Sequence, residues 1–396
     1  MGNERLGAAK RSKNDEFFTQ YVDIEKEINS YLEYNPDVFR GKTVLLPCDD
    51  PEWSNFTKYF AQNFETFGLK KLMSTSYAPN SKPKEISYQP TLFELNSVEF
   101  DAEKDVSNGK IFVLEEDRTG NGVVNVEDLE WSYLEGDGDF RSEEIKALRD
   151  QADVIVTNPP FSLFREFLRW IVEADKEFLI IGNMNALTYK EVFPLLKSNK
   201  VWLGNNYKVN GGAMFYEIPE SIANMDQVRE VRTDEKGKKV FITRVQGVRW
   251  FTNLDHGRRH KPLSLMTMAD NMKFGRVVQN GYDKYDNFDA IEVPRVEAIP
   301  SDYKGVMGVP VSFFDKYSPD QFEILGNTEG FEETPPTKTY SKKQRVVNGV
   351  RAKSNTGTMS GVIRREDFGE GTFFDVGYPV QAVYKRIFIR HRELTE

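Results

Sequence analysis

The sequence DVIVTNPPF, residues 153–161, joins a short apolar run to a corner that contains an asparagine and two prolines. SLFREFLRWIVEA (162–174), which has the pattern of a helix, follows at once. Because Pro fixes φ and is accepted in the first turn of a helix, the stretch predicts a strand that passes into a helix through a rigid corner. Asn158 and the carbonyl of Pro159 would form a fixed pair of hydrogen-bond acceptors, with Phe161 as a stacking face. A purely structural connection accounts for these residues equally well.

Apolar runs alternate with amphipathic segments through the first half of the sequence. The apolar runs, expected to be strands, lie at 42–46, 69–77, 109–117, 153–158, 177–184 and 200–205. The amphipathic segments, expected to be helices, lie at 23–34, 54–64, 142–151, 162–174 and 188–198, with Ser54 and Ser142 as N-caps. This alternation predicts a parallel α/β sheet with helices on both faces. The alternation ends near Leu254: residues 232–254 are expected to be a β-hairpin that ends the sheet, and residues 327–349 a loop.

Three polar clusters follow predicted strands or precede helices: PCDDP at 47–51, GDGDF at 136–140 and TNPPF at 157–161. In parallel α/β sheets the ligand lies outside the carboxyl ends of the strands. Three clusters that are distant in sequence but meet at one edge describe a single site better than three separate ones. This favours a functional interpretation of the corner at 157–161.

The composition suits a globular protein of roughly two or three domains. Of the 396 residues 39% are hydrophobic and 29% are charged. No apolar run approaches the roughly 18 residues that span a membrane, and the N-terminus lacks the apolar stretch of a signal peptide, so a cytoplasmic location is expected. Cys48 is the only cysteine and there are three histidines. No metal site is expected, and the chemistry must come from an organic cofactor or from polar side chains.

The formal net charge of −9 is unevenly distributed. Residues 336–396 contain 12 Lys and Arg against 6 Asp and Glu, a balance of +6, which leaves −15 for the rest of the chain. A basic segment on an acidic body is compatible with local phosphate binding, and a solvated tail explains it equally well.

The corner fits methyl transfer to an exocyclic amino group. The N6 lone pair of adenine is delocalised into the ring, so this amine is a poor nucleophile. Two acceptors that take both N–H hydrogens can pull the nitrogen towards tetrahedral geometry without a charged base, and a stiff corner keeps them in place. A base inside a duplex must be flipped out to reach such a pocket.

With these features the sequence resembles the EcoRI-type adenine-specific DNA methyltransferases. The matching segments include SKNDEFFTQY (12–21), CDDPEWSNFTKYF (48–60), GDGDFRS (136–142), TNPPFSLF (157–164), FLIIGN (178–183), KYDNFDAI (284–291) and GVMGVP (305–310). The resemblance implies a Rossmann-like class I methyltransferase sheet in a catalytic domain at 1–254, S-adenosylmethionine as cofactor, and an added C-terminal DNA-recognition region at 255–396. Double-stranded DNA is the implied partner, and a cognate restriction endonuclease that works without a stable complex is left open.

The resemblance also implies roles for the residues of the NPPF motif. Asn158 and Pro159 would accept hydrogen bonds from the target amino group, and Phe161 would stack on the target base. Asn158 would also border the cofactor. Within 255–396, HGRRHK (256–261), KKQR (342–345) and VIRRE (362–366) offer phosphate or guanine contacts.

The remaining cofactor residues follow from three other motifs. DEFFTQ places Phe18 and Thr19 near the methionine end of the cofactor. CDDP makes Asp49 or Asp50 the partner of its amino group, although a loop or helix-cap role is the alternative. GDF implies that Asp139 accepts a hydrogen bond from the amino group of the cofactor's adenine. Phe140 would pack on the adenine ring.

Two features depart from the family pattern. DDPEWSNF has no glycine where a Gly-rich turn is usual, and LMSTSY (72–77) ends in hydroxyl residues instead of an acid that binds ribose. No ribose ligand can therefore be named. Two further functions stay open: methylation of RNA or of a protein glutamine with the same acceptor pair, and a non-catalytic DNA-binding relative.

Overall fold

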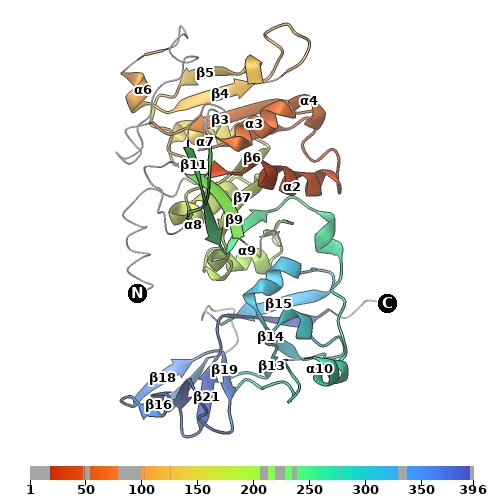
Figure 1. The fold of residues 1–396 in the computed structure, drawn as a ribbon, viewed down its shortest axis with the longest axis vertical. Helices are drawn as coiled ribbons and strands as arrows, with labels where there is room; N and C mark the ends of the chain where they lie inside the picture. Colours follow the sequence, from red (N-terminus) through yellow and green to blue (C-terminus); the bar gives the residue numbers. More distant parts are fainter. Residues whose placement is uncertain are drawn as a thin grey trace. The chain divides into compact units, whose positions relative to one another are not determined.

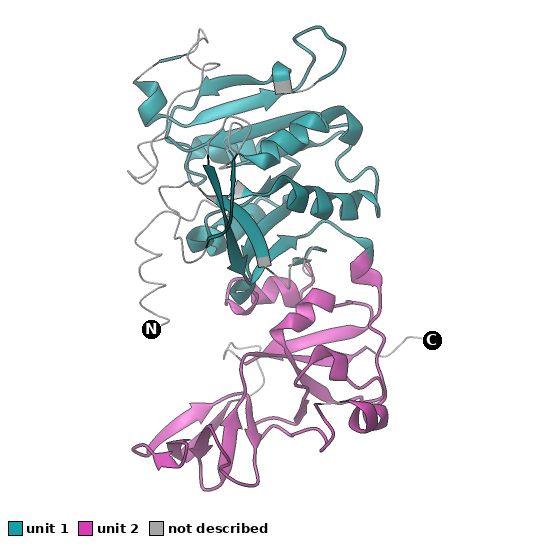
Figure 2. Cartoon of the chain, viewed as in Figure 1, with its two compact units in different colours: residues 1–186, 201–257 teal, residues 187–200, 258–396 magenta. Residues whose placement is uncertain are grey.

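The computed structural model describes residues 18–47, 49, 54–78, 100–101, 103–124, 126–205, 213–218, 228–233, 239–275, 277–328 and 337–392. The chain divides into two compact units, which Figure 2 colours teal and magenta. The first unit contains residues 1–186 and 201–257, and the second contains 187–200 and 258–396. The assignment of catalysis and DNA recognition to separate parts of the chain stays a prediction, because these units are defined by their internal contacts alone.

The centre of the first unit is an eight-stranded sheet with strand order β5-β4-β3-β2-β6-β7-β12-β8. Figure 1 labels β5, β4, β3, β6 and β7 of this sheet. Its four central strands are parallel: β3 (Lys71–Ser76), β2 (Thr43–Leu46), β6 (Val154–Thr157) and β7 (Glu177–Asn183). The flanking strands pair antiparallel: β4 (Lys110–Leu114), β5 (Glu130–Tyr133), β12 (Val248–Thr252) and β8 (Trp202–Leu203). The sheet is therefore mixed, and the expectation of a parallel sheet holds only for its centre.

The antiparallel direction of β4 follows from where the chain enters the sheet. Lys110, the first residue of β4, pairs with Ser76, the last residue of β3. A strand that begins at the edge where its neighbour ends must run in the opposite direction. The sequence pattern of 109–117 predicts a strand but contains no information about that direction.

Helices cover both faces of this sheet, as predicted. On one face, α2 (Tyr21–Leu32) and α3 (Asn55–Gln62) share a core cluster with Val44 of β2, Val154 of β6 and Leu179 of β7. On the other face lies α8 (Phe164–Val172), whose Phe164 ring is 4.9 Å from that of Phe251. Strands β2 and β6 are buried at every residue, which explains their continuous apolar sequences.

The predicted helix starts are confirmed at two serines. The Ser54 side chain accepts a hydrogen bond from Phe56 N at the start of α3. Ser142 does the same for Ile145 N at the start of α7 (Glu143–Gln151). In contrast, the helix expected at 188–198 is limited to α9 (Phe193–Lys197), because Pro194 fits only in a first helical turn. The described residues of the first unit also contain the short helices α4 (Phe64–Phe67) and α6 (Lys104–Ser107).

A second sheet of the first unit has the order β1-β9-β11-β10. Its strands are β1 (Phe18–Thr19), β9 (Ala213–Ile218), β11 (Lys239–Gln246) and β10 (Val228–Thr233). The expected hairpin at 232–254 is thus split between two sheets, since β11 belongs here and β12 belongs to the main sheet. Gly247, with φ of 73°, allows the sharp turn that separates them.

The second unit is mainly β-structure, with one helix, α10 (Met268–Phe274), besides α9 in its described residues. One sheet contains β13 (Ala290–Glu292), β14 (Val306–Pro310), β22 (Arg386–His391) and β15 (Phe322–Asn327). A six-stranded sheet contains β17 (Val350–Arg351), β16 (Lys338–Val347), β20 (Thr372–Asp375), β21 (Pro379–Ala382), β19 (Val362–Arg364) and β18 (Asn355–Met359). No described helix of the chain is long and apolar enough to span a membrane.

Strand β16 corrects the expectation of a loop at 327–349. The described part of that stretch contains a ten-residue strand in which Tyr340 and Val346 are buried. The other residues of this strand are polar or charged except Val347, which is exposed, so the segment has the composition of a loop. The basic segment is therefore largely folded and is not a solvated tail.

A buried ion pair gives a test of this fold. The Asp105 carboxylate in α6 lies 2.7 Å from the Lys110 ammonium in β4, and both side chains are 4% exposed. We expect Asp105→Ala to lower the free energy of unfolding by about 3–5 kcal/mol, because it removes the carboxylate that pairs with a buried ammonium. As a control, Glu143→Ala removes an exposed pair with Lys146 and should cost less than about 1 kcal/mol. Equal losses in urea titrations of the two variants would contradict this description.

Candidate active site

The carboxylate of Asp49 connects the ends of three adjacent strands. Asp49 follows β2 and is 7% exposed. Its Oδ1 accepts a hydrogen bond from Ser54 Oγ at 2.7 Å, and its Oδ2 lies 2.5 Å from Thr157 Oγ1 at the end of β6. Its backbone N–H donates to the carbonyl of Thr75 in β3 at 2.8 Å. Asp49 therefore links β3, β2 and β6 at their carboxyl ends.

The hydroxyl groups at the end of β3 differ in how they are used. Ser74 donates to the Asp49 carbonyl, and Ser76 Oγ accepts from Lys110 N at 3.3 Å. The Thr75 hydroxyl is buried and has no hydrogen-bond partner within the described residues. Of the three aliphatic hydroxyls in LMSTSY, those of Ser74 and Ser76 are therefore already bonded within the protein.

The NPPF corner leaves the sheet directly beside Asp49. Asn158 follows β6 and is half-buried, and Pro159 is buried. Phe161, also half-buried, starts a 3-10 turn (Phe161–Leu163) and packs against the main core cluster. The Pro160 carbonyl accepts from Leu163 N at 2.9 Å, which closes this turn. The predicted passage from strand to helix through a stiff corner is thus present, with a 3-10 turn between the two.

The GDGDF segment lies against the end of β3. Ala78 N donates to the Asp137 carbonyl and Gly109 N to the Gly136 carbonyl, each at 2.9 Å. Gly138 has φ of 85°, and a Cβ atom at this position would lie 2.3 Å from the Ser76 carbonyl oxygen. Only glycine allows this approach. The structure thus brings all three polar clusters to one edge of the sheet.

The Asp139 carboxylate is held by the arginine that follows the motif. Arg141 Nε is 2.8 Å from Asp139 Oδ1, and Arg141 Nη2 is 2.5 Å from Oδ2. These hydrogen bonds raise the pKa of Arg141. Arg141 Nη1 also lies 3.8 Å from the Glu166 carboxylate in α8. A ligand that bonds to Asp139 must share this carboxylate with Arg141, a competitor that the sequence did not reveal.

Phe140 lies in the core. Its side chain is 0% exposed, and its ring makes edge contacts with Phe167 at 5.1 Å and Trp170 at 5.7 Å between centroids. No surface of this side chain is exposed in the structure, and the packing of Phe140 on a ligand ring stays a prediction. Sequence alone cannot distinguish an aromatic residue that packs in the core from one that packs on a ligand, because both can follow a polar motif.

Thr19 lies beside the helix that Ser54 caps. Its carbonyl accepts from Asn55 Nδ2 at 2.8 Å, at the first residue of α3. Its side chain is 3% exposed, and its hydroxyl has no hydrogen-bond partner in the part of the chain that the structure describes. The backbone of Phe18 pairs with Glu217 in β9. Asp50 lies outside the described residues.

Thr157 is the residue of this site that sequence reasoning missed. It was included in TNPPF only as the end of a strand, but its hydroxyl also lies 2.7 Å from the Pro47 carbonyl. Its single hydrogen is shared between this carbonyl and the Asp49 carboxylate. A hydroxyl residue at the last position of an otherwise apolar buried strand is the signal that could have identified it.

No cluster of three His, Cys, Asp or Glu side chains suited to a metal ion occurs among the described residues. His256 is 3% exposed, and its Nε2 lies 3.0 Å from the Leu203 carbonyl. His260 Nδ1 lies 3.5 Å from Asp320 Oδ2. Each of these histidines therefore has a structural contact of its own.

The sequence model of a family described as adenine-specific methyltransferase EcoRI matches residues 5–392. The chain belongs to this family. It is 41% identical over 331 residues to the type II methyltransferase M.EcoRI of Escherichia coli, covering 84% of this chain and 91% of the relative. It is 33% identical over 349 residues to the type II methyltransferase M.MpnI of Mycoplasma pneumoniae, covering 87% and 93%.

M.MgeORF184P of Mycoplasma genitalium, also a type II methyltransferase, is 33% identical over 353 residues, which cover 87% of this chain and 94% of the relative. No solved structure gives a significant match. The prediction that the chain is an enzyme of the EcoRI-type adenine-specific DNA methyltransferase family is confirmed by the family match and the identity to M.EcoRI.

The two glycines of GDGDF provide a matched test of the site. Gly138→Ala should destabilise the chain by at least about 1–2 kcal/mol, the cost of a left-handed residue with a Cβ, and the clash with Ser76 should displace Asp139. Gly136→Ala should be tolerated, because the nearest atom to its Cβ, Glu144 Oε2, is 3.8 Å away. Thermal unfolding measures the first effect, and the methyltransferase activity of the folded protein measures the second. Similar behaviour of the two variants would refute the close approach at Gly138.

Proposed function

We propose that the chain transfers the methyl group of S-adenosylmethionine to N6 of an adenine in duplex DNA, at the carboxyl ends of β2, β3 and β6. The observation that carries this proposal is the position of the NPPF corner. Asn158 directly follows Thr157, whose hydroxyl is bonded to the buried Asp49. Family membership supports the adenine specificity.

The strand order supports a Rossmann-like class I arrangement. From β2 the chain adds β3 on one side, and β6 and then β7 are placed on the other side. The order thus reverses between β2 and β6, and ligands of open α/β sheets bind at such a switch point. Asp49 and Thr157 lie on its two sides, at the ends of these two strands.

The residues at this edge fit the proposed cofactor. Thr19 has a buried hydroxyl that no described group of the protein satisfies, and in this proposal the cofactor supplies its partner. In the proposal, Thr19 and Asp139 hold S-adenosylmethionine together with Asp49 or Asp50. Because both carboxylate oxygens of Asp49 already have hydroxyl partners, we assign Asp49 to positioning and Asp50 to the cofactor's amino group. When bound, the cofactor supplies an electrophilic methyl group.

Asn158 and Pro159 act on the target amino group. The amide oxygen of Asn158 and the carbonyl of Pro159 accept its two N–H hydrogens and draw the N6 lone pair out of conjugation with the ring. The prolines and the turn that starts at Phe161 preorganise these acceptors, so little reorganisation is needed during the reaction. Phe161 supplies a ring face for the base, which is flipped out of the duplex at a cost of about a few kcal/mol.

We assign DNA recognition to the second unit, although fewer of its basic residues are available than the sequence suggests. In HGRRHK, Arg259 is 8% exposed and bonds to Asn199. In KKQR, Lys342 lies 2.7 Å from the Asp375 carboxylate, and Lys343 Nζ lies 5.5 Å from the Phe374 ring centroid. Arg345 is exposed and suited to a phosphate contact.

A labelled-methyl assay with Asn158→Ala tests the proposal. Wild-type protein should label N6 of adenine in duplex DNA, and chelator should not change the rate. Asn158→Ala should lower turnover by about 10²–10³ while S-adenosylmethionine and DNA still bind, because its proposed contacts stabilise the transition state.

Asn253→Ala is the matched control. Asn253 is half-buried, and its amide bonds to Phe178 N and the Lys176 carbonyl at the amino end of β7. The Asn253→Ala variant should have a lower free energy of unfolding, but the turnover of the folded enzyme should not change. Label in cytosine, RNA or protein would refute the proposed substrate, and more than about a tenth of wild-type turnover in Asn158→Ala would refute its role.

A further inference from the structure

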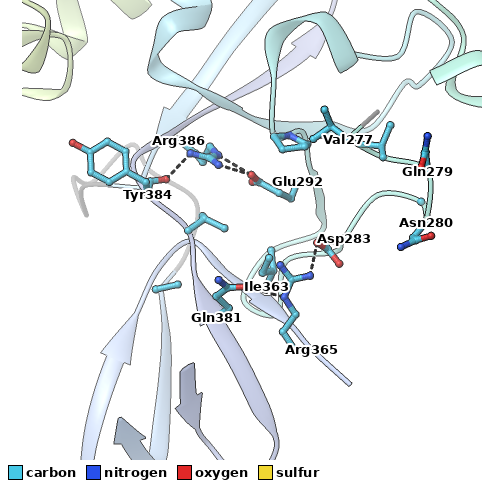
Figure 3. Close-up of a pocket in the computed structure, with 15 residues that line it drawn as sticks. Val277, Gln279, Asn280, Asp283, Glu292, Ile363, Arg365, Gln381, Tyr384 and Arg386 are labelled. Carbon is cyan, nitrogen blue, oxygen red and sulfur yellow. Dashed lines mark hydrogen bonds and ion pairs between the residues drawn. The ribbon is translucent and has the colours of Figure 1, made fainter. Parts of the chain in front are cut away.

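The second unit contains a polar pocket that the methyl-transfer site does not use. Its volume is about 590 Å³. It is lined by residues 277–281, which follow α10, and by side chains from β13, β19, β21 and β22 (Figure 3). Its charged side chains are two arginines, Arg365 and Arg386, and two carboxylates, Asp283 and Glu292.

Arg386 and Glu292 form the fixed wall of this pocket. Arg386 Nε and Nη2 donate to Glu292 Oε1 at 2.8 and 2.6 Å, and Nη1 donates to the Tyr384 carbonyl at 3.0 Å. Glu292 also accepts from the hydroxyl of Tyr285, whose pKa is raised by burial and by this carboxylate. The Arg386 and Glu292 side chains are 14% and 6% exposed, so this pair is structural.

Arg365 is held differently, with part of its guanidinium available. Its Nε donates to Gln381 Oε1 at 2.9 Å and its Nη1 to Asp283 Oδ2 at 2.6 Å, which fix the guanidinium plane from two sides (Figure 3). An arginine has five N–H donors, and Nη2 has no partner among the described residues. The side chain is 33% exposed. Arg365 thus presents preorganised donors to a ligand.

The neighbours of Arg365 extend this pattern. Because a guanidinium can only donate, the Gln381 amide oxygen must face it, and the amide N–H groups point elsewhere. Asp283 accepts through Oδ2, and its Oδ1 has no hydrogen-bond partner within the described chain. The pocket therefore offers donors from Arg365 and Gln381 next to an acceptor from Asp283.

The charge balance selects between the possible ligands. The two arginines and the two carboxylates cancel, which disfavours a phosphate and suits a neutral polar group. In the major groove a G·C pair presents exactly two acceptors, guanine N7 and O6, beside the N4 donor of cytosine. The two acceptors and one donor of a G·C pair therefore complement the pocket, whose donors come from Arg365 and Gln381 and whose acceptor is Asp283.

We propose that this pocket recognises the major-groove edge of a G·C pair in the target DNA, with Arg365 as the specificity-determining residue on guanine. Gln381 and Asp283 position its guanidinium, the Gln381 amide donates to guanine beside it, and Asp283 also accepts from cytosine. The inference rests on the proposed function, since it presumes that the chain binds duplex DNA. It adds to that function one position of the recognised sequence.

The test is selection from a pool of random duplexes with the full-length protein. The bound fraction is sequenced for wild type, Arg365→Lys and Arg390→Ala. Arg365→Lys keeps the charge but loses the planar fork. We expect it to reduce the preference for G·C at one position by about 5- to 150-fold, with the other positions unchanged. Arg390, an exposed arginine that pairs with Glu323 at 2.8 Å, does not line the pocket, and Arg390→Ala should leave the selected sequence unchanged.

Three outcomes would overturn the inference. They are an unchanged preference in Arg365→Lys, a uniform loss of affinity for all duplexes, and a wild-type protein that selects no G·C position. A uniform loss with a weaker salt dependence would identify a phosphate contact instead. Selective binding without methyl transfer would refute the proposed function and leave the pocket's role intact. If Arg365→Lys does not fold, Gln381→Ala tests the same donor pair.

Discussion

The buried carboxylate of Asp49 is the contact on which the candidate site depends. A carboxylate taken out of water must be compensated by hydrogen bonds, and here these come from Ser54 and Thr157. The two hydroxyls belong to the cap of α3 and the end of β6, and Asp49 itself follows β2. The hydrogen bonds that this one carboxylate needs therefore fix the relative positions of α3, β2 and β6. The backbone bond to Thr75 adds a third strand. The NPPF corner therefore begins from a position that cannot shift without exposing or unpairing this carboxylate.

The parts of the fold that sequence could predict are those decided by local pattern. Continuous apolar runs identify β2, β6 and β7, because strands buried on both faces have no polar alternation. Ser54 and Ser142 were found because a cap acts within three residues. Strand direction in β4 and the identity of β16 depend on partners that are distant in sequence, and neither could be inferred. The parallel centre was predictable, and the antiparallel flanks were not.

The candidate site divides in the same way. Topology alone predicts that polar residues after parallel strands gather at one edge, and the three clusters do so. What each side chain does there depends on its neighbours in space. Arg141 shares the Asp139 carboxylate, and Phe167 and Trp170 surround Phe140. Motif position alone revealed neither set of neighbours. In the second unit, likewise, Lys342 forms an ion pair with Asp375, although the sequence alone suggested that this lysine contacts DNA.

The most direct test of this account compares two buried threonines of the same sheet. Thr157 bonds to Asp49 at the carboxyl edge, and Thr252 in β12 donates to the Phe178 carbonyl at 2.7 Å near the amino end of β7. Calorimetry measures the affinity for S-adenosylmethionine in Thr157→Val and Thr252→Val. Both variants should lose a similar free energy of unfolding, about 1–3 kcal/mol, because each leaves a buried acceptor without its donor. The account predicts that only Thr157→Val binds the cofactor at least about tenfold more weakly, the result of losing roughly 1.4 kcal/mol of positioning. Equal affinities in the two variants would contradict it.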